Sequence, residues 1–181
     1  MQRLRTNIVA MGLLCSLASP VSLGLPTDKE QAINISADQA TRDEKTGLTT
    51  YTGSVEFVQG TLRITADKIT IYQQREGAGK IVATGEPAHL QQKPEIHKEL
   101  MRAQANTIEY YEEEDRVHLR TNAQIEQEGS RVTGKTIDYF ISEELVKAGS
   151  DASQENSRVN VVIPPSMIDK KEDEHGPTYS K

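Results

Sequence analysis

The sequence predicts an all-β protein built from repeated, bent strands. Apolar and polar residues alternate along most of the chain, and beyond the N-terminus no stretch of ten residues keeps the i, i+3, i+4 spacing of an amphipathic helix. One short alternating pattern occurs four times, centred on the small residues Ala37, Ala66, Ala105 and Gly134, which are 29, 39 and 29 residues apart. Repetition at this spacing is typical of stacked structural units.

The repeated pattern changes phase at its centre. In the second copy, Leu62 and Ile64 precede Ala66 at even-numbered positions, whereas Ile69 and Ile71 follow it at odd-numbered positions. Because strand side chains alternate between two faces, this slip would turn the apolar set outward unless the chain bulges or bends there. We therefore expect a corner at each small residue, with apolar side chains on both sides of it facing inward, as when a strand passes between the sheets of a sandwich.

A second feature recurs on the strands between these corners. Gly53, Gly85 and Asn122 are 32 and 37 residues apart and are residue types that tolerate a left-handed backbone or a bulge. Turn signals such as Gln59-Gly60 and Glu128-Gly129 separate the strands. The predicted unit is therefore strand, corner, strand, turn, strand, bulge, strand.

The N-terminus has the features of a secretory signal. Arg3 and Arg5 precede an apolar stretch, and the small residues Ser22 and Gly24 occupy the positions that a signal peptidase reads. We expect residues 1–24 to be a cleavable signal peptide. An uncleaved anchor is the alternative, although the apolar run is shorter than the ~20 residues needed to span a bilayer.

Cys15 raises a third possibility, acylation of a lipoprotein, but Leu14 stands where a small residue is expected. Of the 181 residues, 157 remain after residue 24, and they contain no cysteine because Cys15 is the single one. We expect one domain over residues 25–169 and a polar, disordered tail over 170–181. A disulfide scaffold and a thiolate metal site are excluded.

The charge balance disfavours a nucleic-acid partner. The whole chain has a formal charge of −6, and removal of Arg3 and Arg5 with the signal leaves 19 basic against 27 acidic residues. Phosphate contacts require clustered lysine and arginine. We therefore expect no nucleic acid among the partners.

Catalysis has little support in the sequence. The histidines lack the spacing of a metal-binding motif, and no nucleophile elbow stands near them; they are His89, His97, His118 and His175. The dense acidic group at 112–115 is predicted to be a solvated turn. We expect no enzyme activity, cofactor or metal. Two other function classes stay open: a structural or adhesive β-solenoid and, with less support, a glycan-processing enzyme with a pair of carboxylates.

The aromatic content leaves the interior undecided. The chain has no tryptophan and two phenylalanines, so isoleucine, valine, leucine and alanine fill most inward positions. Large aromatic side chains usually fill the gap between packed sheets. The interior is either partly open and lined by aliphatic groups, or a closed core of small residues.

Five segments, in this order, resemble the OstA-like domain of the bacterial lipopolysaccharide transport system. The likeness extends over residues 32–169, and within the family it is strongest to the soluble periplasmic bridge protein. The segments that carry it are 33–38, 51–68, 85–88, 132–137 and 159–164. The acidic hairpin at 111–116 and the tail depart from the family pattern.

The resemblance implies a β-jellyroll of antiparallel strands with a V-shaped section, whose apolar interior shelters the acyl chains of lipopolysaccharide in the periplasm of a Gram-negative bacterium. For each inward residue, ordinary core packing is the alternative to lipid contact. The candidate lipid-binding residues are Ile33, Ile35, Val55, Phe57, Ile64, Leu90, Tyr110, Leu119, Ile125 and Ile137.

The resemblance also implies that copies stack head to tail and join inner-membrane-anchored and outer-membrane components of the same system. Strands at 33–37 and 158–163 are expected at opposite ends of the sheet, where unpaired backbone groups accept another strand. Pairing of unlike edges does not close and generates a filament. The candidate interface residues are Ile33, Ile35, Ala37, Val159, Val161 and Ile163.

Overall fold

The computed structural model describes residues 28–73, 79–94, 97–150 and 157–168. This part contains a short helix, η1 (Asp28–Glu30), one helical turn, α1 (Pro165–Ile168), and ten strands in one antiparallel sheet. The all-β prediction is therefore confirmed. The predicted signal peptide (1–24) and tail (170–181) lie outside the described residues. The strands are β1 (Ile33–Ser36), β2 (Gln39–Asp43), β3 (Leu48–Gln59), β4 (Leu62–Tyr72), β5 (Lys80–Gln92), β6 (Met101–Tyr111), β7 (Arg116–Gln127), β8 (Ser130–Phe140), β9 (Leu145–Gly149) and β10 (Asn160–Val162).

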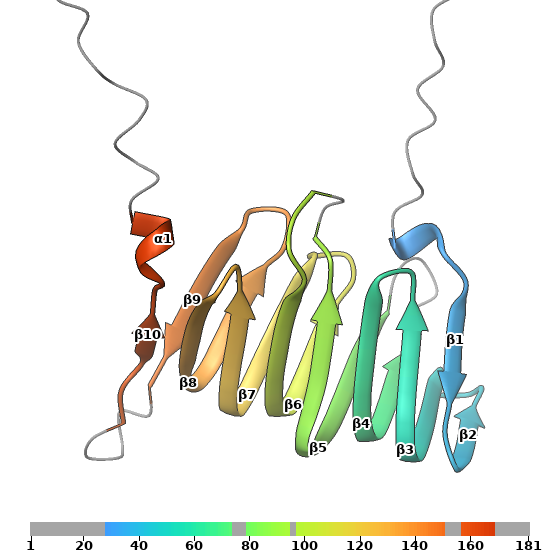
Figure 1. Cartoon of the computed structure of the whole chain (residues 1–181). Coiled ribbons are helices and arrows are strands. Elements are labelled where there is room, and N and C mark those ends of the chain that lie inside the picture. Colours follow the sequence, from blue (N-terminus) through green and yellow to red (C-terminus); the bar gives the residue numbers. More distant parts are fainter. Residues whose placement is uncertain (1–27, 74–78, 95–96, 151–156, 169–181) are drawn as a thin grey trace, which may run out of the picture.

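The strands follow one another across the sheet in chain order. From β3 to β8 each strand pairs with the next, while β1 and β2 both pair with β3, and β9 and β10 both pair with β8. One edge is therefore β1 with β2, and the opposite edge is β9 with β10 (Figure 1). This meander needs no crossover, because each hairpin joins antiparallel neighbours.

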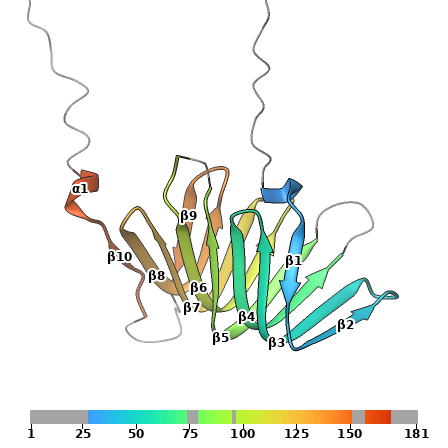
Figure 2. The same ribbon diagram turned by 45° about the vertical axis from the view of Figure 1, so that its right-hand side comes forward.

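Each long strand from β3 to β8 bends near its middle, so the sheet folds into a V (Figures 1 and 2). The pairing is interrupted between Thr65 and Lys68 on β4 and between Gln104 and Thr107 on β6, around the predicted corners Ala66 and Ala105. On β8 the interruption follows Gly134. The corners predicted at Ala66, Ala105 and Gly134 are confirmed. The remaining one, Ala37, lies in the gap between β1 and β2.

The second recurring feature forms the bends of β3, β5 and β7. Gly53 has a φ of +82°, and a Cβ atom there would lie 2.1 Å from Oδ2 of Asp38, so no larger residue fits. Asn122 has a φ of +56°. Pro87 lies in the unpaired stretch of β5, where its missing N–H interrupts no ladder.

The bends divide the sheet into two halves that face each other. The front half of Figure 1 comprises β1, β10 and the segments 55–59, 62–66, 88–92, 101–105, 123–127 and 130–134. The rear half comprises β2, β9 and the segments 48–52, 68–72, 80–84, 107–111, 116–120 and 136–140. The inward side chains of both halves form one hydrophobic cluster.

We expect truncation in this cluster to cost far more stability than truncation at the edge. Leu119 is 0% exposed, whereas Leu145 on β9 is 36% exposed. Leu119→Ala should lower the free energy of unfolding by about 2–5 kcal/mol through lost burial and the residual cavity. Leu145→Ala removes the same atoms from a partly solvent-exposed position and should lower the free energy of unfolding by less than ~1 kcal/mol. Urea unfolding measures both, and equal losses would contradict a core centred between the halves.

Candidate functional site

The candidate site is the apolar interior between the two halves. Eight of the ten candidate lipid-binding residues are at most 4% exposed: Val55, Phe57, Ile64, Leu90, Tyr110, Leu119, Ile125 and Ile137. Ile35 is half-buried, and Ile33 at the β1 edge is 53% exposed. The structure brings all ten residues to the inner face, where most of them are shielded from solvent.

One row of apolar residues crosses the whole front half. Residues paired across an antiparallel ladder share a face, so the strand register determines which residues belong to this row. From the β1 edge to the β10 edge it consists of Ile35, Phe57, Ile64, Leu90, Ala103, Ile125, Val132 and Val161.

A matching row crosses the rear half. It consists of Ala40, Tyr51, Ile69, Ala83, Ile108, Leu119, Ile137 and Ala148. The sequence-based set of lining residues omitted Ile69 and Ile108, although both follow a predicted corner at the phase that turns inward. The two rows face each other and extend from one edge of the sheet to the other.

The helix η1 joins the two halves at the mouth of the V, which is the side opposite the corners. Asp28 Oδ1 accepts a hydrogen bond from the amide of Thr61 at 2.6 Å, in the β3–β4 hairpin of the front half. On the rear half, Lys29 Nζ lies 3.3 Å from Oδ1 of Asp115 and donates to the carbonyl of Glu112 at 2.8 Å. The acidic hairpin therefore makes contacts across the mouth, while Glu113 and Glu114 at its tip are exposed, as predicted for a solvated turn.

Two further contacts cross the mouth. Lys98, in the loop between β5 and β6 of the front half, forms an ion pair with Glu144 in the β8–β9 turn of the rear half. The hydroxyl of Tyr139 on the rear half donates to Oε1 of Gln127 on the front half at 3.5 Å. The ion pair is partly exposed to water, so it contributes at most about 1 kcal/mol.

Two tyrosines of the interior stay uncharged over the physiological range. Burial raises the pKa of Tyr110, and the carboxylates of Asp115, Glu112 and Asp28 raise it further. Burial likewise raises the pKa of Tyr139, with a smaller contribution from Asp115. Because a neutral phenol is amphipathic, both side chains suit an apolar space that ends at a wet mouth.

The outer face of the rear half carries a charged network. Burial opposes ionisation of Glu109, but a hydrogen bond from Tyr111 and the charges of Arg120 and Lys80 hold the pKa of Glu109 below its ordinary value. Nη2 of Arg120 lies 2.8 Å from Oε1 of Glu109.

The histidines form no catalytic or metal-binding constellation in the part of the chain that the structure describes. Nδ1 of His118 lies 2.8 Å from Oδ1 of Asp138, within the surface network. His89 and His97 are exposed on separate elements, and His175 lies outside the described residues. Among residues 28–73, 79–94, 97–150 and 157–168 there is no group of three or more histidine, cysteine, aspartate or glutamate residues placed to hold a metal.

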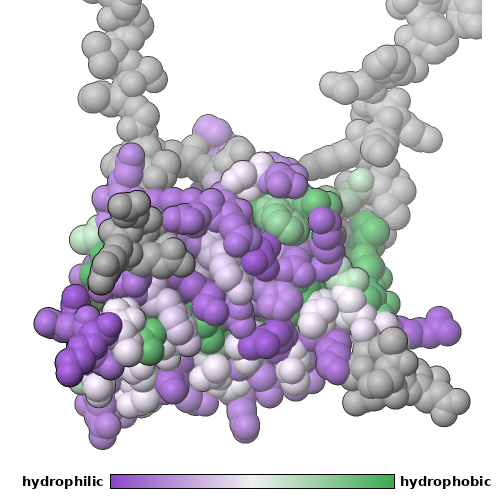
Figure 3. Space-filling model, turned by 180° about the vertical axis from the view of Figure 1, so that it is seen from behind, coloured by the Kyte–Doolittle hydropathy of each residue, from purple (hydrophilic) through white to green (hydrophobic). Residues whose placement is uncertain are grey.

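The two edges of the sheet expose apolar side chains. Val161, Val162 and Ile163 are each more than half exposed, as is Ile33 at the other edge. The rear view shows a largely hydrophilic face with hydrophobic residues at the β9–β10 end (Figure 3). Neither edge pairs with a further strand within the described residues.

The edge strands are shorter than predicted from sequence. Strand β1 ends at Ser36, before Ala37, and β10 spans Asn160–Val162, so Val159 and Ile163 flank it. Pro164 and Pro165 follow β10, and α1 begins at Pro165. Proline suits a first helical position, because the N–H that it lacks has no partner there. No helix in the described ranges is long and apolar enough to cross a membrane.

Comparisons with known proteins agree with this architecture. Residues 34–145 match the family model described as LptA/(LptD N-terminal domain) LPS transport protein. The lipopolysaccharide export system protein LptH of Pseudomonas aeruginosa is 36% identical over 118 residues, which cover 65% of this chain and 67% of LptH. The lipopolysaccharide export system protein LptA of Escherichia coli K12 is 32% identical over 83 residues, 46% of this chain and 44% of LptA.

A solved structure has the same fold. The crystal structure of LptH, described as the LptA homologous periplasmic component of the lipopolysaccharide transport device of P. aeruginosa, superposes with a TM-score of 0.72 at 33% identity. The match covers 77% of this chain and 100% of that chain. The fold is thus the β-jellyroll that the resemblance implied, and these relatives are transport proteins, so the enzyme alternative is wrong. The chain belongs to the LptA/(LptD N-terminal domain) family of LPS transport proteins.

Proposed function

We propose that this chain is a periplasmic lipopolysaccharide-binding transport protein that holds lipid A acyl chains between the halves of its sheet and stacks head to tail between the two membranes. The observation that carries the proposal is the pair of facing apolar rows that runs without a polar residue from the β1–β2 edge to the β9–β10 edge. In a stack joined through these edges, the rows of successive copies continue one another.

The energetics of lipid transfer favour such a path. Each methylene group moved from water to an apolar setting gains roughly 0.8 kcal/mol, so a fourteen-carbon chain left in water costs on the order of 10 kcal/mol. A lipid with several chains does not cross an aqueous space unaided. An aliphatic interior close in polarity to the bilayer lets the chains enter and leave without a large change in free energy.

Lipid entry requires the halves to part, because Phe57 and Ile137 on the facing halves are 0% exposed. We infer that they part at the mouth, where the ion pairs of Lys29 and Lys98 are accessible to water and therefore weak. The apolar surface exposed by opening is then covered by the acyl chains that enter.

Photo-crosslinking tests the interior as the lipid site. A photoreactive amino acid in place of Phe57 or Tyr110 should form adducts with lipopolysaccharide in cells, because both side chains point inward. The matched control is Lys68, next to inward Ile69 and on the outer face of the rear half. Equal labelling from Lys68 and Phe57, detected as a lipid-shifted band, would contradict acyl chains in the interior.

Tethering the mouth tests the route of entry. Residues 25–181 contain no cysteine, so in protein without residues 1–24 Lys98→Cys with Glu144→Cys provides a single pair that a short bis-maleimide reagent links. The linked protein should lose at least tenfold in binding of a fluorescent lipopolysaccharide, because its halves no longer part. Each single-cysteine variant treated with the same reagent is the control. Unchanged binding by the linked protein would rule out entry between Lys98 and Glu144.

A charge on the edge tests head-to-tail stacking. Val161→Lys places an ammonium group at the end of the front row, where the side chain is 54% exposed and supports no core. A copy seated on this edge would have to bury that charge. Light scattering across a concentration series should show weaker self-association. Glu113→Gln, which adds the same unit of charge in the β6–β7 turn, should leave assembly unchanged, and equal effects of both changes would contradict pairing through β10.

A further inference from the structure

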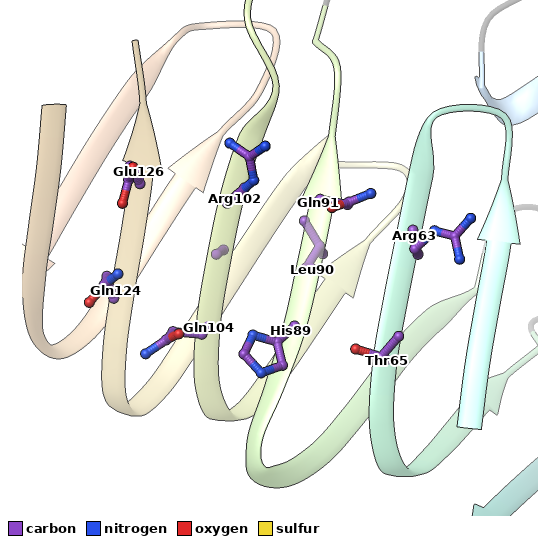
Figure 4. A pocket seen from close by; sticks show the side chains of 10 residues that line it. Arg63, Thr65, His89, Leu90, Gln91, Arg102, Gln104, Gln124 and Glu126 are labelled. Carbon is purple, nitrogen blue, oxygen red and sulfur yellow. The ribbon is translucent and has the colours of Figure 1, made fainter. Parts of the chain in front are cut away.

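The outer face of the front half contains a cleft that the interior site does not use. Its volume is about 380 Å³, and it lies across β4, β5, β6 and β7 (Figure 4). Eight of its ten lining residues alternate with those of the apolar row, so their side chains point away from the interior, whereas Leu90 and Ala103 belong to that row.

The register places the side chains of the cleft in two polar rows. The row nearer the mouth consists of Arg63, Gln91, Arg102 and Glu126. The row nearer the corners consists of Thr65, His89, Gln104 and Gln124. Cross-strand neighbours on one face stand within reach of one another, and Figure 4 shows these side chains on one face of β4 to β7.

The cleft carries an arginine without an anionic partner. Glu126 accepts hydrogen bonds from Nε and Nη2 of Arg131, at 3.2 and 3.0 Å. Arg63 forms an ion pair with Glu56. Arg102 is exposed in the row nearer the mouth. Within the described residues no carboxylate lies within ion-pair distance of its guanidinium group. The surface therefore offers a guanidinium group to an anion.

The remaining groups of the cleft suit hydroxyl groups. The carboxamides of Gln91, Gln104 and Gln124 each donate and accept hydrogen bonds, as does the hydroxyl of Thr65. A guanidinium group binds a phosphate through two parallel hydrogen bonds. A small inorganic anion would engage the arginines and leave the amide row unused, whereas a phosphorylated sugar would engage both.

We propose that this cleft binds a phosphorylated saccharide. The row that contains Arg102 adjoins the mouth, because Gln91 is one residue from the last residue of β5 and Arg102 is one residue from the first residue of β6. The source of the saccharide rests on the proposed function: a glycolipid with its acyl chains in the interior would carry its head group out of the mouth, over the rim of the front half and onto this face.

Calorimetry with the purified protein tests the cleft. The probe is deacylated, phosphorylated lipopolysaccharide oligosaccharide, which has no chains to enter the interior. Arg102→Gln should weaken its binding at least tenfold, because it removes the bidentate donor. Arg42→Gln, on exposed β2 of the rear half, is the matched control and should bind as the wild type does. An equal loss in both variants would overturn the site.

Two more probes fix the ligand class. The same oligosaccharide after phosphatase treatment should bind at least tenfold more weakly, and inorganic phosphate should bind more weakly than the intact oligosaccharide. Equal binding of the dephosphorylated form, or of inorganic phosphate alone, would overturn a phosphorylated-saccharide site.

The result is separable from the proposed function. Oligosaccharide binding that depends on Arg102, together with no lipid adduct from Phe57, would uphold the cleft and reject acyl chains in the interior. Lipid adducts from Phe57 with oligosaccharide binding indifferent to Arg102 would reject the cleft and leave the transport proposal standing.

Discussion

The structure depends on one constraint, namely that each long strand must face the same interior on both sides of its bend. With strict alternation, a bent strand would present its apolar side chains inward before the corner and outward after it. The interrupted pairing on β4 and β6 resets the alternation, so Ile64 and Ile69 are both 0% exposed. Because every strand from β3 to β8 is reset at the same level, the bends align and one sheet encloses a core.

The same constraint separates two chemistries on a single sheet. Inside, the paired residues Ile64 and Leu90 belong to an apolar row; outside, the next positions, Arg63 and Gln91, belong to a polar one. One strand register therefore fixes both surfaces, and a change of register would exchange them. An amphiphile needs this separation, since its chains and head group require opposite surroundings at a short distance. A structural or adhesive solenoid would need only a packed core and no polar outer row. The family assignment gives this alternative no support.

The corners were predictable because their signal is local: the phase slip around Ala66 spans only a few residues. The edge strands were predictable for the same reason, apart from their ends. The contacts across the mouth were not predictable, because Lys29 and Asp115 are 86 positions apart and no sequence pattern relates the two residues. The composition of the acidic hairpin predicts its exposure to water but not its contact with Lys29. The outer cleft was equally hidden, since four strands contribute to it and only the register brings Arg63 near Arg102.

The edges link the enclosed rows to assembly. An isolated chain leaves Ile33 and Val161 more than half exposed, each at an end of the sheet, where apolar side chains beside unpaired backbone invite another strand. The two edges differ in sequence, so joining them extends the stack rather than closing it. The rows contain one phenylalanine, one tyrosine and otherwise aliphatic residues, which leaves few positions that would hold an acyl chain much more tightly than their neighbours. Under the proposed function, this evenness is what keeps a lipid moving, because transfer along a stack requires successive sites of nearly equal free energy.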